Sequence, residues 1–279
     1  MSSFHNYAES ATHYDVTRQA VAYEIWLGAM MRYAPAALQN VRLLDAGIGT
    51  GNYTDALASF VGQVNGIDLS HEMLKQAKAK FADVSHGDKI KLEQGSLLAL
   101  PFEAETFDAV MINQVLHHLD DGTDKAYNGH RAAVNEASRV LKPGGVLLVN
   151  ACSHRQLRDG FWYNQLIAHA LDDTCARIAP VPLFAQMIAE AGLEVQARHV
   201  PVHSIMQGDA YFEMKGVFSD EWRAGDSIWS VASKEELDAA RNTVRRLIEA
   251  DEADNWFETR DRERRHVGQL TFWIAQKTS

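Results

Sequence analysis

A short apolar run followed by three alternating glycines constrains this chain more than any other feature. Residues 41–44 are typical of a buried strand, and residues 53–60 favour a helix. Gly47, Gly49 and Gly51 stand between them. Glycine adopts positive φ and lets a ligand approach the backbone, and the helix that follows directs unpaired N–H groups toward that ligand. The order of strand, glycine turn and helix predicts a nucleotide cradle.

Two acidic residues indicate which nucleotide the cradle suits. Asp68 ends the next apolar run, residues 64–69, and a carboxylate there accepts hydrogen bonds from the two hydroxyls of a ribose. Asp45 stands directly before the glycines, where a carboxylate that points into the turn repels a pyrophosphate. We therefore expect a nucleoside that carries a cation, in place of a dinucleotide.

Four motifs in this order resemble the class I S-adenosylmethionine-dependent methyltransferases, most closely the branch that modifies small molecules. They are Asp45 with its three glycines, Asp68, the run 107–119 that ends in His-His-Leu, and the run 139–148 that contains Lys-Pro-Gly-Gly. The resemblance is closest over residues 40–152. It implies S-adenosylmethionine as the cofactor and an α/β fold, a doubly wound, mostly parallel seven-stranded sheet that is Rossmann-like and whose last strand inserts antiparallel.

Chain length and segment pattern favour a single domain, residues 1–279, built by additions to this core. Residues 40–152 form the expected cofactor-binding core. Residues 1–38 form an N-terminal helical cover, since apolar positions recur at helical spacing from Asp15 to about Ala37. Residues 203–268 are too many for a loop between neighbouring strands and are expected to form a mainly helical cap insertion before the last strand.

The resemblance assigns most cofactor contacts to the carboxyl ends of the first strands. The turn after the third strand commonly carries an acid toward the adenine in the family, whereas this chain has Ser96 there, which leaves backbone contacts from Ser96 and Leu97. Tyr14 and Arg18 either reach over the methionyl end or only cap and solvate a helix start. The expected cofactor-binding set is Tyr14, Arg18, Asp45, Gly47, Gly49, Gly51, Asp68, Leu69, Met73, Ser96, Leu97, Asn113 and Gln114.

Polar residues at the end of the fourth strand are expected to border the reacting centre. Asn113 and Gln114 end a buried apolar run, and ligands of open α/β sheets lie beyond the carboxyl ends of the strands. The histidine pair that follows either braces the loop over the cofactor or transfers a proton. Our candidates are His118, Asn113 and Tyr14 for catalysis and His117 for substrate contact.

An acidic loop and a pair of aromatic residues each allow either a functional or a purely structural role. Asp120, Asp121 and Asp124 lie in a glycine-containing loop, where acids usually make turns and helix caps, so no metal is predicted. Trp162 and Tyr163 follow the strand that ends near residue 151, and we expect them to contact the substrate. Most other aromatic residues of the cap are expected to be core.

Composition narrows the compartment and the partners. The formal charge is −10, which disfavours nucleic acid as a substrate, and the basic cluster at residues 260–266 is expected to be a solvated face. No apolar run approaches the ~18 residues of a membrane span, and the start of the chain lacks a signal-peptide pattern. We expect a cytoplasmic monomer or homodimer that acts on a small-molecule substrate, with Cys152 and Cys175 reduced.

The expected reaction is in-line methyl transfer to a small molecule. Because no acid–base constellation stands out, a nitrogen or sulfur acceptor is favoured and oxygen stays possible. Three alternatives remain: attack on another carbon beside the sulfonium with release of methylthioadenosine (a cyclase or alkyl transferase), a non-catalytic nucleoside-binding module, and a macromolecule-modifying methyltransferase. The nucleoside product separates the first, binding without turnover marks the second, and nucleic-acid binding at low salt would mark the third.

Overall fold

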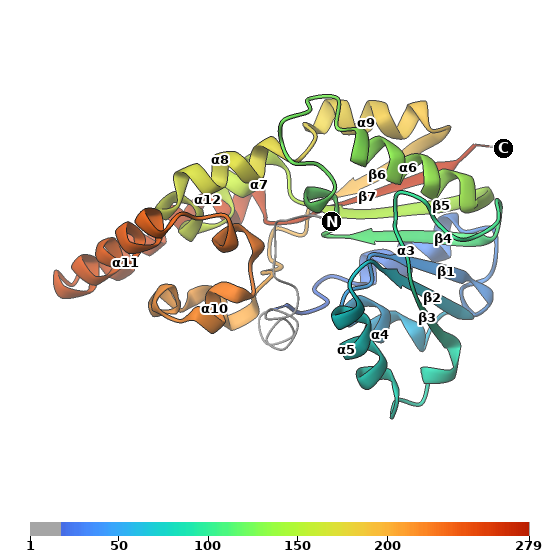
Figure 1. Cartoon of the computed structure of the whole chain (residues 1–279), viewed down its shortest axis with the longest axis horizontal. Helices are drawn as coiled ribbons and strands as arrows, with labels where there is room; N and C mark the ends of the chain where they lie inside the picture. Colours follow the sequence, from blue (N-terminus) through green and yellow to red (C-terminus); the bar gives the residue numbers. More distant parts are fainter. Residues whose placement is uncertain (1–17, 279) are drawn as a thin grey trace.

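The computed structural model describes residues 18–278, and a seven-stranded sheet forms its centre (Figure 1). The sheet order is β3-β2-β1-β4-β5-β7-β6, with β7 antiparallel to β5 and β6 and every other neighbouring pair parallel. The predicted doubly wound α/β fold with an antiparallel last strand is confirmed. The strands are β1 (Arg42–Ala46), β2 (Gln63–Asp68), β3 (Ile90–Gln94), β4 (Phe107–Asn113), β5 (Leu141–Ala151), β6 (Leu193–His199) and β7 (Thr271–Lys277).

Helices cover both faces of the sheet because its central strands are apolar on both sides. In β1, Leu43 packs in the core that includes Trp26 and Leu57, whereas Leu44 packs in the core on the opposite face, with Val134. All five side chains are fully buried, and each burial contributes about 1.5–3 kcal/mol. One face carries α3 (Glu24–Tyr33), α4 (Asn52–Ala58) and α5 (His71–Phe81), and the other carries α6 (Asn128–Val140) and α9 (Val181–Glu190).

The N-terminal helix is shorter than its apolar spacing predicts. Within the described residues it begins at Glu24, because Ala22 has φ +56°, a left-handed conformation that interrupts a right-handed helix. Arg18 therefore does not cap this helix. Residues 1–17, which include Tyr14, lie outside the part of the chain that the structure describes, so the roles predicted for Tyr14 stay predictions.

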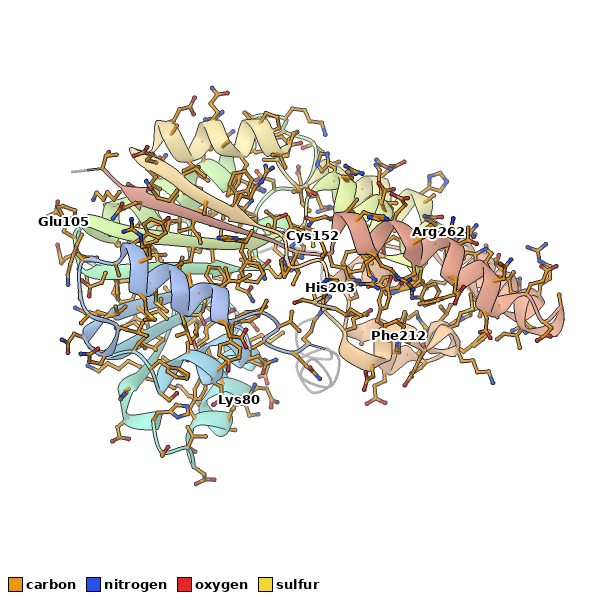
Figure 2. All side chains as sticks on the ribbon, turned by 180° about the vertical axis from the view of Figure 1, so that it is seen from behind. Lys80, Glu105, Cys152, His203, Phe212 and Arg262 are labelled. Atoms are coloured by element: carbon orange, nitrogen blue, oxygen red, sulfur yellow. The ribbon has the colours of Figure 1, made fainter. Side chains whose placement is uncertain are left out.

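A mainly helical cap extends from the carboxyl end of the sheet, as predicted for the long insertion (Figure 1). Ser233 begins α11 with the capping box expected from the sequence, in which Ser233 and Glu236 satisfy each other's backbone N–H groups. Figure 2 shows Cys152 where the sheet meets the cap, and Phe212 and Arg262 further out on the cap. The cap contains η5 (Gly208–Phe212), η6 (Met214–Phe218), α10 (Asp220–Ala224), η7 (Ser227–Ser230), α11 (Lys234–Glu249) and α12 (Ala253–Val267).

The segment between β5 and α9 packs with the cap. It contains α7 (His154–Asp159), η4 (Trp162–Leu166) and α8 (Ala168–Ala176). Trp162 lies edge-on to Trp256 of α12 and close to Trp222 of α10, so an aromatic cluster joins the segment to the cap.

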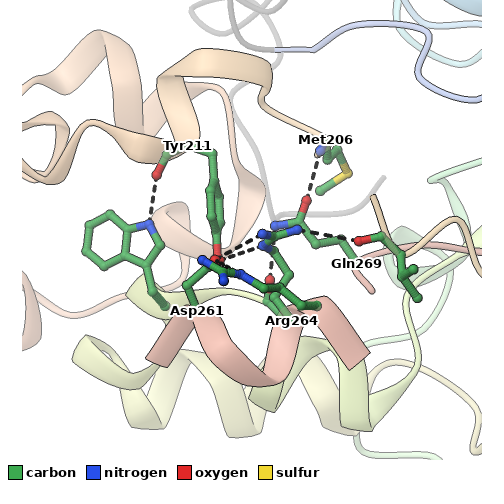
Figure 3. A network of polar contacts seen from close by, with 9 residues as sticks. Met206, Tyr211, Asp261, Arg264 and Gln269 are labelled. Atoms are coloured by element: carbon green, nitrogen blue, oxygen red, sulfur yellow. Dashed lines mark hydrogen bonds and ion pairs between the residues drawn. The ribbon is translucent and has the colours of Figure 1, made fainter. Parts of the chain in front are cut away.

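A buried polar network fixes α12 to the rest of the cap (Figure 3). Asp261 is fully buried and forms a bidentate pair with Arg264, with Nε and Nη2 donating at 2.5 and 2.9 Å. The Tyr211 hydroxyl donates to the same carboxylate at 2.9 Å. Burial opposes ionisation of Asp261, but the hydrogen bonds from Arg264 and Tyr211 lower its pKa below the usual value. The carboxylate therefore stays charged and holds both partners.

Among residues 18–278, no helix combines the length and the apolar character needed to cross a membrane.

Candidate active site

One large cavity opens at the carboxyl ends of β1, β2, β4 and β5, beneath the start of the cap. Its volume is about 1010 Å³. Segments far apart in the sequence contribute to its wall, from the N-terminal segment to the cap. The wall includes Arg18, Asp45, Gly47, Gly49, Asp68, Leu69, Met73, Ser96, Leu97, Asn113, Gln114, His117 and His118 from the predicted set, together with Tyr53, Asn150, Arg177, Met206, Gly225 and Ser227.

The three glycines of the turn all adopt positive φ, but they differ in what surrounds them. A Cβ at Gly47 would lie 2.5 Å from Val115, and a Cβ at Gly51 would lie 2.4 Å from the ring of Phe81, so these two glycines allow close packing. A Cβ at Gly49 would meet no atom within 4 Å. Gly49 lines the cavity and leaves room for a ligand against the backbone.

Gly51 is a correction to the predicted cofactor-binding set. It does not line the cavity; it is the N-terminal cap residue of α4, with φ +84°, and it packs against α5 through Phe81. The alternation of glycines along the sequence could not separate a residue that approaches a ligand from one that allows two helices to pack.

Asp68 lies at the end of β2 on the cavity wall and already holds the glycine turn. Its carboxylate accepts hydrogen bonds from the backbone N–H of Gly49 at 2.9 Å and of Ser70 at 2.8 Å. Burial raises its pKa, and these hydrogen bonds oppose the rise. Each carboxylate oxygen has a further lone pair, so Asp68 can accept from a sugar hydroxyl while it orders the turn.

Asp45 ends in the same cavity but is almost fully buried. The hydroxyl of Thr54, in α4, donates to its Oδ2 at 2.6 Å. Burial raises the pKa of Asp45 to about 7, and the nearby charge of Asp68 adds to the rise, while the Thr54 hydrogen bond opposes it. A cation bound beside Asp45 would favour the ionised carboxylate, as the sequence interpretation requires.

The adenine end of the predicted site lies beside β3. Ser96 and Leu97 line the cavity, and the hydroxyl of Ser96 accepts from the backbone N–H of Leu98 at 3.2 Å. Leu69 and Met73 line the same region. Leu69 is 55% exposed, which is unusual for leucine beside a core and suits a side chain that a ligand covers.

The amides at the end of β4 form a cluster with a residue of the next strand. Asn113 and Asn150 are register partners in the β4–β5 ladder, and Nδ2 of Asn150 donates to Oδ1 of Asn113 at 2.8 Å. Gln114 has φ +53°, and its backbone N–H donates to the carbonyl of Asn150 at 2.8 Å. A non-glycine residue in this conformation is strained by about 1–3 kcal/mol and is typical of functional sites.

Both histidines of the pair line the cavity. Nε2 of His117 lies 3.2 Å from the hydroxyl oxygen of Ser227 at the start of η7, so His117 joins the loop after β4 to the cap. The rings of His117 and His118 are tilted by 45° with their centroids 3.9 Å apart. The arrangement brings an imidazole that can exchange a proton to the wall of the cavity while also bracing the loop.

Arg18 lies on the cavity wall and is tied to the cap. Its Nε donates to the carbonyl of Gly225 at 2.6 Å, and its Nη2 forms an ion pair with Asp226 at 3.3 Å. The sequence offered two roles, a contact to the cofactor carboxylate or the start of a helix. The structure gives Arg18 a third role, in which it links the N-terminal segment to the cap.

Trp162 and Tyr163 are a correction to the predicted substrate contacts. Both are fully buried in the aromatic cluster and do not line the cavity. The Trp162 indole donates to the carbonyl of Tyr211 at 2.8 Å, and the Tyr163 hydroxyl donates to Asp226 at 2.6 Å. Their polar atoms are used inside the core because the cap packs over the sheet rim where these aromatics lie.

The three loop aspartates make turns and caps. Asp120 accepts from the backbone N–H of Gly129 and from His130 Nδ1, Asp121 accepts from Thr123, and Asp124 accepts from Ala126 and Asn128. Across residues 18–278, no group of three or more His, Cys, Asp or Glu side chains is arranged to hold a metal ion.

Several cavity residues were not found from the sequence. Asn150 ends a buried strand as Asn113 does, so the rule that singled out Asn113 applied to it as well. Arg177 and Met206 come from irregular segments and Ser227 begins the short η7, where no periodicity marks which side chains face a ligand.

A doubly wound sheet, with a glycine turn and a strand-ending acid on the wall of a cavity at its carboxyl edge, defines an α/β fold of the Rossmann-like class. Residues 44–149 match the model of a methyltransferase domain. The match agrees with the resemblance to class I S-adenosylmethionine-dependent methyltransferases that the four motifs carry.

Similar proteins support the same family. Demethylmenaquinone methyltransferase of Staphylococcus aureus (strain MRSA252) is 33% identical over 141 residues, which is 48% of this chain and 54% of the relative. This chain therefore spans about half the length of the curated relatives it matches.

Solved structures share the fold over most of the chain. A putative methyltransferase from an antibiotic biosynthesis pathway of Anabaena variabilis ATCC 29413 has a TM-score of 0.69 at 17% identity, covering 91% of this chain and 97% of that one. Geranyl diphosphate C-methyltransferase from Streptomyces coelicolor A3(2), solved with Mg²⁺, geranyl-S-thiolodiphosphate and S-adenosyl-L-homocysteine, has a TM-score of 0.53 at 18% identity, covering 91% and 76%.

Proposed function

We propose that this protein transfers the methyl group of S-adenosylmethionine to a small molecule that binds in the cavity beneath the cap. The observation that carries the proposal is the open space at Gly49, in a cavity whose wall also includes Asp45 and Asp68, within residues that match a methyltransferase-domain model. A nucleoside with a cationic tail matches both acids, whereas a phosphate at the same turn would meet two negative charges.

The residues present fit this cofactor. Asp68 would accept from the ribose hydroxyls, Leu69, Ser96 and Leu97 would border the adenine, and Asp45 would lie on the side of the positive charges. The cavity volume of about 1010 Å³ is at the upper end of the range for ligand pockets, which leaves room for a second small molecule. When bound, S-adenosylmethionine supplies a methyl group that its sulfonium already activates.

The chain's own task is then to align the acceptor and to exclude water. The cap residues Met206, Gly225 and Ser227 close the cavity opposite the sheet, and Asn113 and Gln114 border the reacting centre from β4. Asn113 and His118 remain our candidates for catalytic contact. We propose that His117, which lies 3.2 Å from the hydroxyl of Ser227, contacts the acceptor.

We propose a nitrogen or sulfur acceptor that attacks the methyl carbon in line with its bond to sulfur. Such an acceptor needs mainly positioning, because the sulfonium already activates the methyl group. The histidines nevertheless make an oxygen acceptor possible. The relative named for demethylmenaquinone and the fold neighbour named as a geranyl diphosphate C-methyltransferase extend the range of acceptors to be tested to quinones and isoprenoids.

Identification of the nucleoside product tests the proposed function. Purified protein is incubated with S-adenosylmethionine and a panel of small amines, thiols, phenols and quinols, and the nucleosides are separated by chromatography. S-adenosylhomocysteine, formed in proportion to a methylated acceptor, is the expected product. Methylthioadenosine would instead show attack on another carbon beside the sulfonium, and binding without turnover would indicate a non-catalytic nucleoside-binding module.

A further inference from the structure

A chain of hydrogen bonds leads from the N-terminal segment to the amides at the reacting centre. The Tyr53 hydroxyl lies 2.9 Å from the carbonyl of Val21, Nδ2 of Asn150 lies 3.4 Å from the Tyr53 oxygen, and the same Nδ2 lies 2.8 Å from Oδ1 of Asn113. Oδ1 of Asn150 lies 3.3 Å from Nε2 of Gln114. Asn150 is fully buried, and these partners satisfy both the nitrogen and the oxygen of its amide.

The donor and the acceptor in each of these hydrogen bonds can be assigned by starting from the backbone carbonyl of Val21. A backbone carbonyl only accepts, so the Tyr53 hydroxyl must donate to Val21, and its oxygen can then only accept from Asn150. The Asn150 nitrogen therefore faces Tyr53 and Asn113, and its oxygen faces Gln114. Because Asn113 offers its oxygen to Asn150, its NH₂ group is turned the other way.

That NH₂ group donates to no acceptor among the residues 18–278 that the structure describes, and Asn113 lines the cavity. An amide nitrogen presented to a ligand selects an atom that accepts hydrogen bonds. The zwitterionic tail of the proposed cofactor has one such group, its carboxylate. Arg18, the sequence candidate for that carboxylate, is engaged with Asp226 and Gly225.

We propose that Asn150 is a positioning residue, which orients the Asn113 amide so that its NH₂ group binds the carboxylate of the cofactor's amino-acid moiety. The inference rests on the proposed function and deepens it. Asp45 then lies on the side of the ammonium and the sulfonium, and Asn113 on the side of the carboxylate. Since β1 and β4 are neighbours in the sheet, the two ends of the zwitterion meet adjacent strands.

Two nucleosides that differ in the amino-acid tail test this assignment by binding alone. S-adenosylhomocysteine has the carboxylate and methylthioadenosine lacks it, while both carry the same adenine and ribose. The affinity of each is measured by calorimetry for the wild-type protein and for Asn113→Ala, Asn150→Ala and the double variant. Tyr53→Phe, a milder change that keeps the ring, serves if Asn150→Ala fails to fold.

The proposal predicts a selective loss. Asn113→Ala weakens S-adenosylhomocysteine by at least about tenfold, because a hydrogen bond to a charged group is lost, and leaves methylthioadenosine unchanged. Asn150→Ala weakens S-adenosylhomocysteine by about three- to tenfold with the same selectivity, and Tyr53→Phe acts in the same direction. The double variant binds no more weakly than Asn113→Ala, since Asn150 acts through Asn113.

Asn65→Ala is the matched control, because Asn65 is a buried asparagine of β2 outside the cavity wall. It should leave the ratio of the two affinities at the wild-type value. Equal losses for both nucleosides in the Asn150 or Tyr53 variant, an unchanged ratio in Asn113→Ala, or losses that multiply in the double variant would overturn the assignment. Wild-type protein that binds neither nucleoside would instead overturn the proposed function.

Discussion

At the scale of single residues, the site depends on two carboxylates that the fold treats differently. The carboxylate of Asp68 accepts two backbone hydrogen bonds that order the glycine turn, and each of its oxygens can accept one more from a ligand in the cavity. Asp45 is buried deeply enough that its proton is held up to a pH of about 7. The first carboxylate suits a neutral diol, and the second suits a cation that favours loss of its proton.

Replacing Asp68 tests the ribose contact. Asp68→Ala removes a charged acceptor and the hydrogen bonds that order the turn, so the affinity for S-adenosylhomocysteine should fall by at least about 1.5 kcal/mol in calorimetry. Asp83→Ala, at an exposed aspartate near the end of α5, is the control. An unchanged affinity in Asp68→Ala would show that the sugar is held elsewhere.

The pKa of Asp45 predicts how cofactor binding depends on pH. A bound cation favours the ionised carboxylate, so the affinity for S-adenosylmethionine should rise by about tenfold between pH 6 and pH 8 as Asp45 ionises through a pKa of about 7. Asp45→Asn, which cannot ionise at this position, is the matched variant. A pH dependence that persists unchanged in it would contradict the assignment to Asp45.

The same pKa has a consequence for folding. The pKa of Asp45 is raised above its unfolded value of 3.8, so the protonated form favours the fold at low pH. This contribution to stability is therefore lost as the pH rises from about 4 through 7, in the absence of a bound cation.

At the scale of elements, the turn between β1 and α4 combines a ligand contact with a packing contact. Gly49 and Gly51 both have positive φ, yet only Gly51 touches another helix. Gly49→Ala should weaken cofactor binding while lowering the melting temperature little, because an alanine in this conformation costs about 1–2 kcal/mol. Gly51→Ala should lower the melting temperature markedly, since its Cβ would overlap the Phe81 ring.

Thermal unfolding and calorimetry on the two glycine variants check this division of roles. Equal losses of stability, or unchanged binding in Gly49→Ala, would contradict the assignment of Gly49 as the residue that the ligand approaches.

The stability of the cap depends on the hydrogen bonds that the buried Asp261 makes to Arg264 and Tyr211. Asp261→Ala leaves Arg264 charged without its partner in the interior, so the free energy of unfolding should fall by about 3–5 kcal/mol, measured by denaturant titration. Tyr211→Phe removes one hydrogen bond and should cost about 1–3 kcal/mol. A loss in Asp261→Ala no larger than in Tyr211→Phe would show that the ion pair does not hold the cap.

At the scale of the whole molecule, the sequence predicted the sheet because its signals are local. Glycine spacing, strand-ending acids and the alternation of strands with helices identified the part of the cavity wall that we assign to the cofactor, including Asp45, Gly49 and Asp68. The rest of the cavity wall could not be predicted, because Ser227 and Arg177 reach the cavity only through packing of η7 and of the segment after α8 over the sheet. Trp162 and Tyr163 were assigned to the ligand for the same reason, since position along the chain does not reveal which aromatics the cap buries.

The central claim is that a cationic nucleoside binds at the carboxyl end of β1, with its ribose on Asp68. A crystal structure of the protein with S-adenosylhomocysteine tests it most directly. The account predicts ribose hydroxyls within hydrogen-bond distance of the Asp68 carboxylate and the homocysteine tail between Asp45 and Asn113. A nucleoside bound elsewhere in the molecule, or a phosphate seated in the glycine turn, would contradict it.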